Sequence, residues 1–249
     1  MYQEERINKI LQWLQEKEVL SNQDIMNRLN VSRDTARRDI IKVVESGKAV
    51  RTHGGIVGIH CLTNVGNYQM RKTENVEGKR RIGREAAKHL AADTVCFFDT
   101  STHMPYVCSE LERMKIYTHS LDNLELLADL SSVEVYSLGG KLYKENRFFY
   151  SADTIKKVYN LNFDIALFGA ASVKEDGIYY VDEEEAFLKS LVAERADQVI
   201  VMADHPKFHR QANFRGLTYD KIDLMITDRE PNDEWKNFLK KEKVKCISV

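Results

Sequence analysis

Apolar positions in the first sixty residues repeat with the period of an α-helix. In the first segment, the i, i+3, i+4, i+7 stripe consists of Ile7, Ile10, Leu11 and Leu14. Ser21 predicts the start of a second helix, in which Ile25 and Leu29 face inward. Ser32 is a suitable N-cap for a third helix, whose buried stripe is Ala36, Ile40, Val43 and Val44.

The sequence after the third helix predicts a small β-hairpin. Gly47 can end the helix, and the segment KAVRTHGGIVG alternates weakly around Gly54 and Gly55. Three short helices and a hairpin are typical of a winged helix-turn-helix, a DNA-binding domain that we expect over residues 1–57.

The distribution of charge supports a DNA-binding domain only in one region of the chain. The whole chain of 249 residues has 37 basic and 38 acidic side chains, so its net charge of −1 does not indicate a partner. Residues 31–53, however, hold six basic side chains against three acidic ones. With Ala36 and Ile40 inward, the third helix turns four charged side chains outward: Arg33, Asp34, Arg37 and Arg38.

Arginines near the start of a recognition helix can bind guanine bidentately or neutralise a phosphate. The Ser32 and Thr35 hydroxyls lie at the same helix end, where free N–H groups favour a phosphate. A plain solvated face with an Asp34–Arg38 pair is the alternative. We favour DNA contacts, with Lys48 and Arg51 on the hairpin binding phosphates.

From residue 76 onwards, apolar strands alternate with helices. Residues 58–75 show neither the helix nor the strand period, and we expect them to form a linker that can contain a short strand. Apolar runs predict strands at TVCFF, KIYT, VEVYSLGG, FDIALFGA, QVIVMAD, IDLMITD and KCISV. This alternation indicates an α/β domain over residues 76–249, with a parallel sheet covered on both faces.

Ligands of open α/β sheets bind at the carboxyl ends of the strands. Small residues and hydroxyls follow several predicted strands, where backbone N–H groups can approach an anion, and Lys207 can supply a positive charge. The residues expected at an effector site are Asp99, Thr100, Ser101, Thr102, His103, Thr118, Ser120, Gly139, Gly140, Gly169, Asp204 and Lys207. Ordinary N-caps and turns are the alternative for any one strand end.

The string VSRDTARRDI, followed by RTHGG, resembles the signature of DeoR-type bacterial transcriptional repressors, VS-x-x-TIRRDL and then R-x-HGG. Ala36 and Ile40 depart from it only on the buried face. The resemblance implies DNA binding and adds His53 to the expected contacts.

The strand-end motifs resemble the C-terminal sensor domain of the same family. That domain is similar in fold to ribose phosphate isomerase and binds phosphorylated sugars or related metabolites. Its D-x-GTT, T-N-S and D-x-SKF motifs stand here as DTSTH, THS and DHPKF, so Ser101 replaces a glycine and His103 a threonine. The resemblance implies a repressor of a carbohydrate operon, controlled by a phosphorylated sugar.

An isomerase-like enzyme fused to a DNA-binding module is the alternative function, and a constitutive DNA-binding protein with an oligomerising large domain is a third. Proton shuttling needs a positioned acid and base, but the string Gly169-Ala170-Ala171-Ser172 offers neither. The acidic run 182–185 is interpreted as the start of a helix, with Glu185 and Lys189 as a surface pair. We therefore expect no enzyme.

We expect no cofactor and no metal, since His205 and His209 lack a third ligand. The four cysteines form no C-x-x-C pair and are expected to be reduced. The N-terminus does not resemble a signal peptide, and no apolar run reaches the length of a membrane span. We expect a cytoplasmic homo-oligomer whose partners are double-stranded DNA and a small-molecule effector, with no membrane contact.

Overall fold

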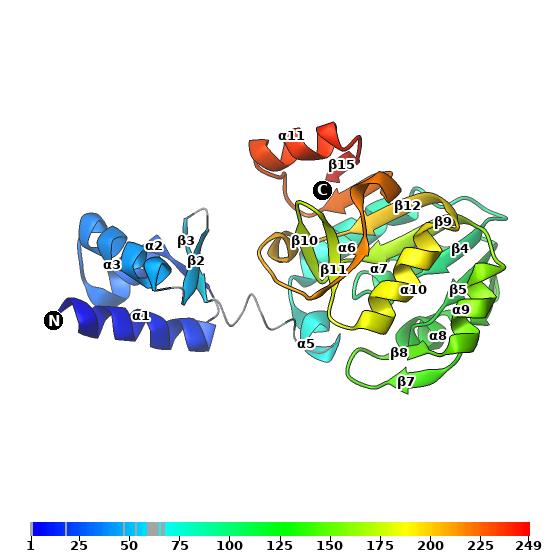
Figure 1. Cartoon of the computed structure of the whole chain (residues 1–249), viewed down its shortest axis with the longest axis horizontal. Helices are drawn as coiled ribbons and strands as arrows, with labels where there is room; N and C mark the ends of the chain where they lie inside the picture. The colour runs from blue at the N-terminus through cyan, green and yellow to red at the C-terminus, as the bar shows by residue number, and fades with distance from the viewer. Residues whose placement is uncertain (1, 18, 47, 53, 59–64, 66–67) are drawn as a thin grey trace. The chain divides into compact units, whose positions relative to one another are not determined.

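A computed structural model describes residues 2–17, 19–46, 48–52, 54–58, 65 and 68–249 (Figure 1). The chain divides into two compact units, residues 1–65 and 66–249.

The described residues of the first unit form three helices and a small antiparallel sheet. Its elements are α1 (Gln3–Lys17), β1 (Val19–Ser21), α2 (Asn22–Leu29), α3 (Arg33–Glu45), β2 (Ala49–Thr52) and β3 (Gly55–Gly58). The expected hairpin is present as β2 and β3, which pair from Ala49 opposite Gly58 to Thr52 opposite Gly55. Strand β1 completes the order β1-β3-β2 and was not expected, because three residues between two helices show no period.

Local sequence explains where these helices begin. Ser21 and Asp24 form a complete capping box at α2, and the Ser32 side chain accepts a hydrogen bond from the Thr35 N–H at α3. The stripes expected from the sequence form one core, with Ile10, Leu14, Ile25, Leu29, Ala36, Ile40 and Val43 buried. A partly buried ion pair, Arg6 Nε to Asp39 Oδ2 at 2.6 Å, connects α1 to α3.

The second unit begins with two helices. They are α5 (Tyr68–Thr73) and α6 (Val76–Ala87), so the range expected as a linker contains a helix, and Tyr68 in it is fully buried. The central sheet is formed by β4 (Val95–Phe98), β5 (Met114–Thr118), β6 (Val133–Ser137), β9 (Phe163–Gly169), β12 (Ala196–Met202), β14 (Leu224–Thr227) and β15 (Lys245–Ser248). All seven were expected from the apolar runs.

The other elements connect these strands. They are α7 (Met104–Val107), η1 (Cys108–Glu110), α8 (Leu121–Leu127), β7 (Lys141–Tyr143), β8 (Phe148–Tyr150), α9 (Ala152–Tyr159), β10 (Ser172–Lys174), β11 (Gly177–Tyr180), α10 (Glu183–Ala193), η2 (His205–Phe208), β13 (Phe214–Leu217), η3 (Tyr219–Lys221) and α11 (Asp233–Lys241).

The central sheet is parallel, in the order β15-β14-β12-β9-β4-β5-β6. Alternate residues of each strand face opposite sides, and each side has its own core. Phe97, Phe168 and Val201 pack with residues of α9, α10 and α11, whereas Phe98 and Leu167 pack with residues of α6, α7 and α8. The domain is therefore the expected parallel α/β sandwich, covered on both faces (Figure 1).

Two smaller sheets were not expected from the sequence. Strands β10, β11 and β13 form an antiparallel sheet, and β7 and β8 form a hairpin. Each strand is three or four residues long, which is too short to show a clear period. Among the described cysteines, Cys96 and Cys108 are buried and Cys246 is partly buried, all three as free thiols. No helix within the described residues is long and apolar enough to cross a membrane.

Candidate functional site

The exposed face of α3 carries the arginines expected from the sequence. Arg33, Arg37 and Arg38 are all exposed. Within the described residues no hydrogen bond or ion pair engages their guanidinium groups, and the Asp34–Arg38 pair of the alternative interpretation is not formed. These charges are therefore available to an external partner.

Part of this face is hollowed. Three arginines share the hollow, which is lined by Asn22, Met26, Arg33, Asp34, Ala36, Arg37 and Arg51. Its surface thus combines three positive side chains with one negative one. Ser32, Thr35, Arg38 and Lys48 lie outside the hollow, although Ser32, Arg38 and Lys48 are exposed and Thr35 is partly exposed. His53 lies outside the described residues.

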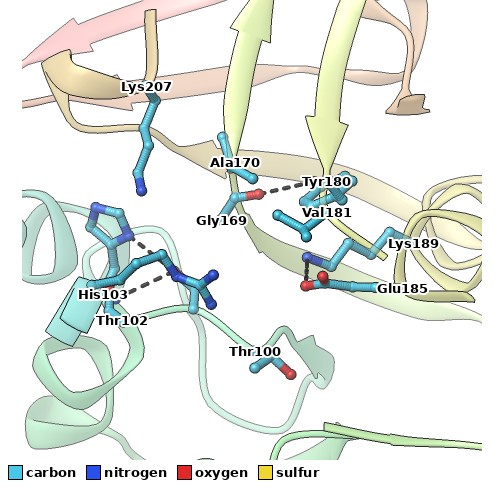
Figure 2. Close-up of a pocket in the computed structure, with 13 residues that line it drawn as sticks. Thr100, Thr102, His103, Gly169, Ala170, Tyr180, Val181, Glu185, Lys189 and Lys207 are labelled. Atoms are coloured by element: carbon cyan, nitrogen blue, oxygen red, sulfur yellow. Dashed lines mark hydrogen bonds and ion pairs between the residues drawn. The ribbon is translucent and has the colours of Figure 1, made fainter. Parts of the chain in front are cut away.

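A second cavity lies in the second unit, at the carboxyl ends of β4 and β9 (Figure 2). Its lining residues are Arg71, Thr100, Ser101, Thr102, His103, Gly169, Ala170, Ala171, Tyr180, Val181, Glu185, Lys189 and Lys207. Of the expected effector residues, the structure thus brings Thr100–His103, Gly169 and Lys207 to one cavity. Its volume of about 30 Å³ has room for roughly two water molecules.

Lys207 is the cation with no partner in this cavity. It is almost fully buried, and no hydrogen bond or ion pair within the described residues engages its ammonium group. Burial lowers its pKa to about 7, a shift that nearby Asp204 opposes and Arg210, Arg71 and Lys79 reinforce. Figure 2 shows Lys207 reaching toward His103 and Thr102, away from Glu185 and Lys189.

His103 fills one side of the cavity. Its Nδ1 lies 2.9 Å from the Ser101 hydroxyl, while its buried Nε2 has no hydrogen-bond partner among the described residues and lies 4.0 Å from Asp204 Oδ1. Burial lowers the pKa of His103 to about 4, so the imidazole is neutral at physiological pH. Gly169 makes room for Ser101, because a Cβ on it would stand 2.5 Å from the serine hydroxyl.

Asp99 supports the cavity from behind and does not line it. Its Oδ2 accepts hydrogen bonds from Gly169 N–H at 2.9 Å and lies 2.9 Å from Lys189 Nζ, and its Oδ1 accepts from Thr100 N–H at 2.6 Å. Lys189 also donates to Glu185 Oε1 at 2.6 Å. The expected Glu185–Lys189 pair is therefore present, but its surface location is wrong, since both residues are buried where α10 packs on the sheet.

The remaining expected residues do not reach the cavity. The Thr118 hydroxyl donates to Phe98 C=O at 2.6 Å, and Ser120 caps α8. Both are fully buried. Gly140 is needed by the β7–β8 hairpin, because a Cβ there would stand 2.5 Å from the Tyr150 carbonyl, and the neighbouring Gly139 also has positive φ.

Sequence reasoning missed the contribution of α5 and α6. Arg71 of α5 lines the cavity and donates to Asn146 Oδ1 at 3.0 Å. Lys79 of α6 is buried beside it and donates to the Arg71 carbonyl oxygen. Burial lowers the pKa of both cations. A helix of six residues has no readable period, so only the two basic residues themselves could have indicated this role.

A winged helix-turn-helix with free arginines, joined to an α/β domain with a cationic cavity, defines a ligand-responsive DNA-binding regulator. Residues 6–61 match the DeoR-like helix-turn-helix domain, and residues 74–229 match the DeoR C terminal sensor domain. The chain belongs to the DeoR family and is a DNA-binding transcriptional regulator.

Named relatives align with this sequence over nearly the whole chain. The HTH-type transcriptional repressor GlcR of Bacillus subtilis is 34% identical over 249 residues, which cover 99% of this chain and 96% of that protein. The glycerol-3-phosphate regulon repressor of Escherichia coli is 25% identical and covers 93% of each chain.

Comparison with solved structures gives matches at low sequence identity. The eIF2B beta structure from Chaetomium thermophilum aligns with a TM-score of 0.50 and 10% identity, over 90% of this chain and 85% of that one. Ribose 5-phosphate isomerase a from Methanocaldococcus jannaschii aligns with a TM-score of 0.38 and 18% identity, over 54% and 55%.

Proposed function

We propose that this regulator represses a carbohydrate-metabolism operon and that a phosphorylated sugar, or a similar anionic metabolite, controls it. The single observation that carries this proposal is the cavity-lining Lys207, a buried residue whose ammonium has no partner among the described residues and which lies near the positive charges of Arg71 and Lys79. Buried cations that repel one another favour an anion between them. The names of the relatives support the ligand class, because one of them represses a glycerol-3-phosphate regulon.

We assign the phosphate to the backbone and hydroxyls of Thr100, Ser101 and Thr102, with Lys207 and Arg71 as countercharges. Backbone N–H groups between a strand end and a helix form a suitable anion site. A sugar phosphate is larger than the 30 Å³ cavity, so binding requires side chains around the cavity to rearrange or part of the ligand to lie outside it. Asp99 supports this site from behind, whereas Thr118, Ser120, Gly139 and Gly140 do not line it.

Calorimetry with a panel of sugar phosphates, on the wild type and Lys207→Ala, tests this assignment. We expect one panel member to bind the wild type and Lys207→Ala to bind it about tenfold or more weakly, since one charge-assisted contact is lost. Equal binding by the two proteins would remove Lys207 from the site.

Binding should also take up a proton above neutral pH. Free Lys207, with its pKa lowered to about 7, is mostly neutral at pH 8, and a bound phosphate favours its charged form. Affinity should therefore fall as pH rises above about 7, by up to about tenfold per pH unit. Calorimetry at pH 8 in two buffers of different ionisation enthalpy measures the uptake, and Lys207→Arg, which stays charged, should show none.

We infer that the cavity performs no turnover. Glu185, the carboxylate that lines it, is held by Lys189 at 2.6 Å, and Asp99 is bound to the same ammonium. Neither carboxylate is free to act as a base. The test is incubation with each sugar phosphate that binds, followed by product analysis. Conversion at a rate above the protein-free control would favour an isomerase-like function.

We propose that the protein acts in the cytoplasm as a homo-oligomer on repeated or inverted half-sites. One helix-turn-helix reads few base pairs, and two copies bound about one helical turn apart supply the missing affinity. Sedimentation at micromolar concentration should show a dimer or a larger assembly. A strict monomer that protects a single half-site tightly would contradict this.

A further inference from the structure

Helix α5 lies between the DNA-binding unit and the cavity of the second unit along the chain. It begins at Tyr68, shortly after Val65, where the first unit ends. Through Arg71 it also lines the cavity of the second unit. A ligand that contacts Arg71 therefore acts on the first described helix of the second unit.

The junction between α5 and α6 is fastened to the loop that carries Lys207. Arg210, in the segment after η2, donates through Nη2 to Glu74 Oε2 at 2.6 Å. This pair is largely buried, with 10% of the Arg210 side chain and 31% of the Glu74 side chain exposed. Asn75 adds a second tie, because its Nδ2 donates to Asp204 Oδ2 at 3.2 Å and to Asp228 Oδ2 at 2.9 Å.

Arg210 has unused hydrogen-bonding capacity. Its Nη1 is buried without a hydrogen-bond partner in the described part of the chain. Among the described residues, Glu74 is the only carboxylate that forms an ion pair with the Arg210 guanidinium. The positive charge of Arg210 also repels those of Arg71, Lys79 and Lys207. An anion beside Lys207 would remove this repulsion and attract the loop and α5 toward each other.

We propose that the Glu74–Arg210 ion pair couples occupancy of the cavity to the order of α5, and through α5 to the DNA-binding unit. This inference rests on the anion site proposed above. Glu74 is negative and lies on the α5–α6 junction, so it binds no phosphate itself. Its role is to keep the α5–α6 segment attached to the loop when the loop closes on an anion.

Hydrogen exchange with and without inorganic phosphate tests this coupling. In the wild type, phosphate at about ten times its Kd should slow exchange about tenfold in both residues 68–79 and the loop 204–210. In Glu74→Gln the slowing should persist in the loop but fall below about twofold in residues 68–79. Asp93→Asn, which breaks an exposed ion pair with Arg113, is the matched control and should behave as the wild type.

Two results separate this inference from the function on which it rests. Undiminished slowing of residues 68–79 in Glu74→Gln would overturn the coupling and leave the anion site intact. No slowing anywhere in the wild type would overturn the anion site, and the coupling with it. Arg210→Gln breaks the same pair from the other side and decides the question if Glu74→Gln exchanges rapidly throughout the second unit without phosphate.

Discussion

Replacing Lys189 by methionine should lower the free energy of unfolding by about 3–5 kcal/mol. Lys189 is 1% exposed, and its ammonium lies 2.9 Å from Asp99 Oδ2 and 2.6 Å from Glu185 Oε1. The substitution keeps the volume of the side chain but leaves two carboxylates in the interior without their cation. Asp99 also accepts hydrogen bonds from the Gly169 and Thr100 N–H groups, so losing its cation also destabilises the cavity wall that these residues form.

Chemical denaturation of the wild type, Lys189→Met and Lys156→Met measures this effect. Lys156 pairs with Asp153 at 3.3 Å on the surface, with more than three quarters of each side chain exposed. Its replacement should cost at most about 1 kcal/mol. If the two variants lose equal stability, the Asp99–Lys189–Glu185 cluster does not have the structural role assigned to it.

Replacing Arg37 by alanine should weaken binding to a specific DNA duplex about 10- to 100-fold. This range corresponds to about 1–3 kcal/mol for one bidentate arginine–guanine contact. Arg37 is exposed on α3, has no partner in the described part of the chain, and shares a hollow with Arg33 and Arg51. The duplex is selected from a random pool with the wild type, and affinities are measured over a range of salt concentrations.

The salt dependence distinguishes the kinds of contact. Arg37→Ala should relax specificity at one base pair, whereas Arg51→Ala should weaken binding evenly across sequences and reduce the salt slope by about one. Arg113→Ala removes an exposed arginine from the sensor unit and serves as the charge-matched control. Unchanged affinity and salt slope in Arg37→Ala would exclude Arg37 from the DNA interface.

The sequence was sufficient for the features that depend on local signals. Ser21 and Ser32 cap their helices as expected, because an N-cap needs only a hydroxyl and the N–H groups of the next turn. The strands of the parallel sheet were readable from their apolar runs, most clearly β4, β9, β12 and β14, which lie inside the sheet and are mostly buried. The edge strands β6 and β15 are more exposed.

Features that depend on distant partners were not readable. Glu185 and Lys189 have the spacing of a surface ion pair, and only Asp99 at the end of β4 makes their burial possible. Thr118 and Ser120 have the residue types of ligand contacts, but Phe98 and Asn123 use their hydroxyls internally. In both cases the residue type indicated a polar contact, and packing determined which partner the side chain meets.

The most direct test of the account measures operator affinity with and without the sugar phosphates of the panel. At least one should change the affinity of the wild type by about fivefold or more, and operator should change the affinity for that sugar phosphate by the same factor. Lys207→Ala should bind operator as the wild type does but lose the response. If no sugar phosphate changes the operator affinity, or if Lys207→Ala responds as the wild type does, sensing through this cavity is contradicted.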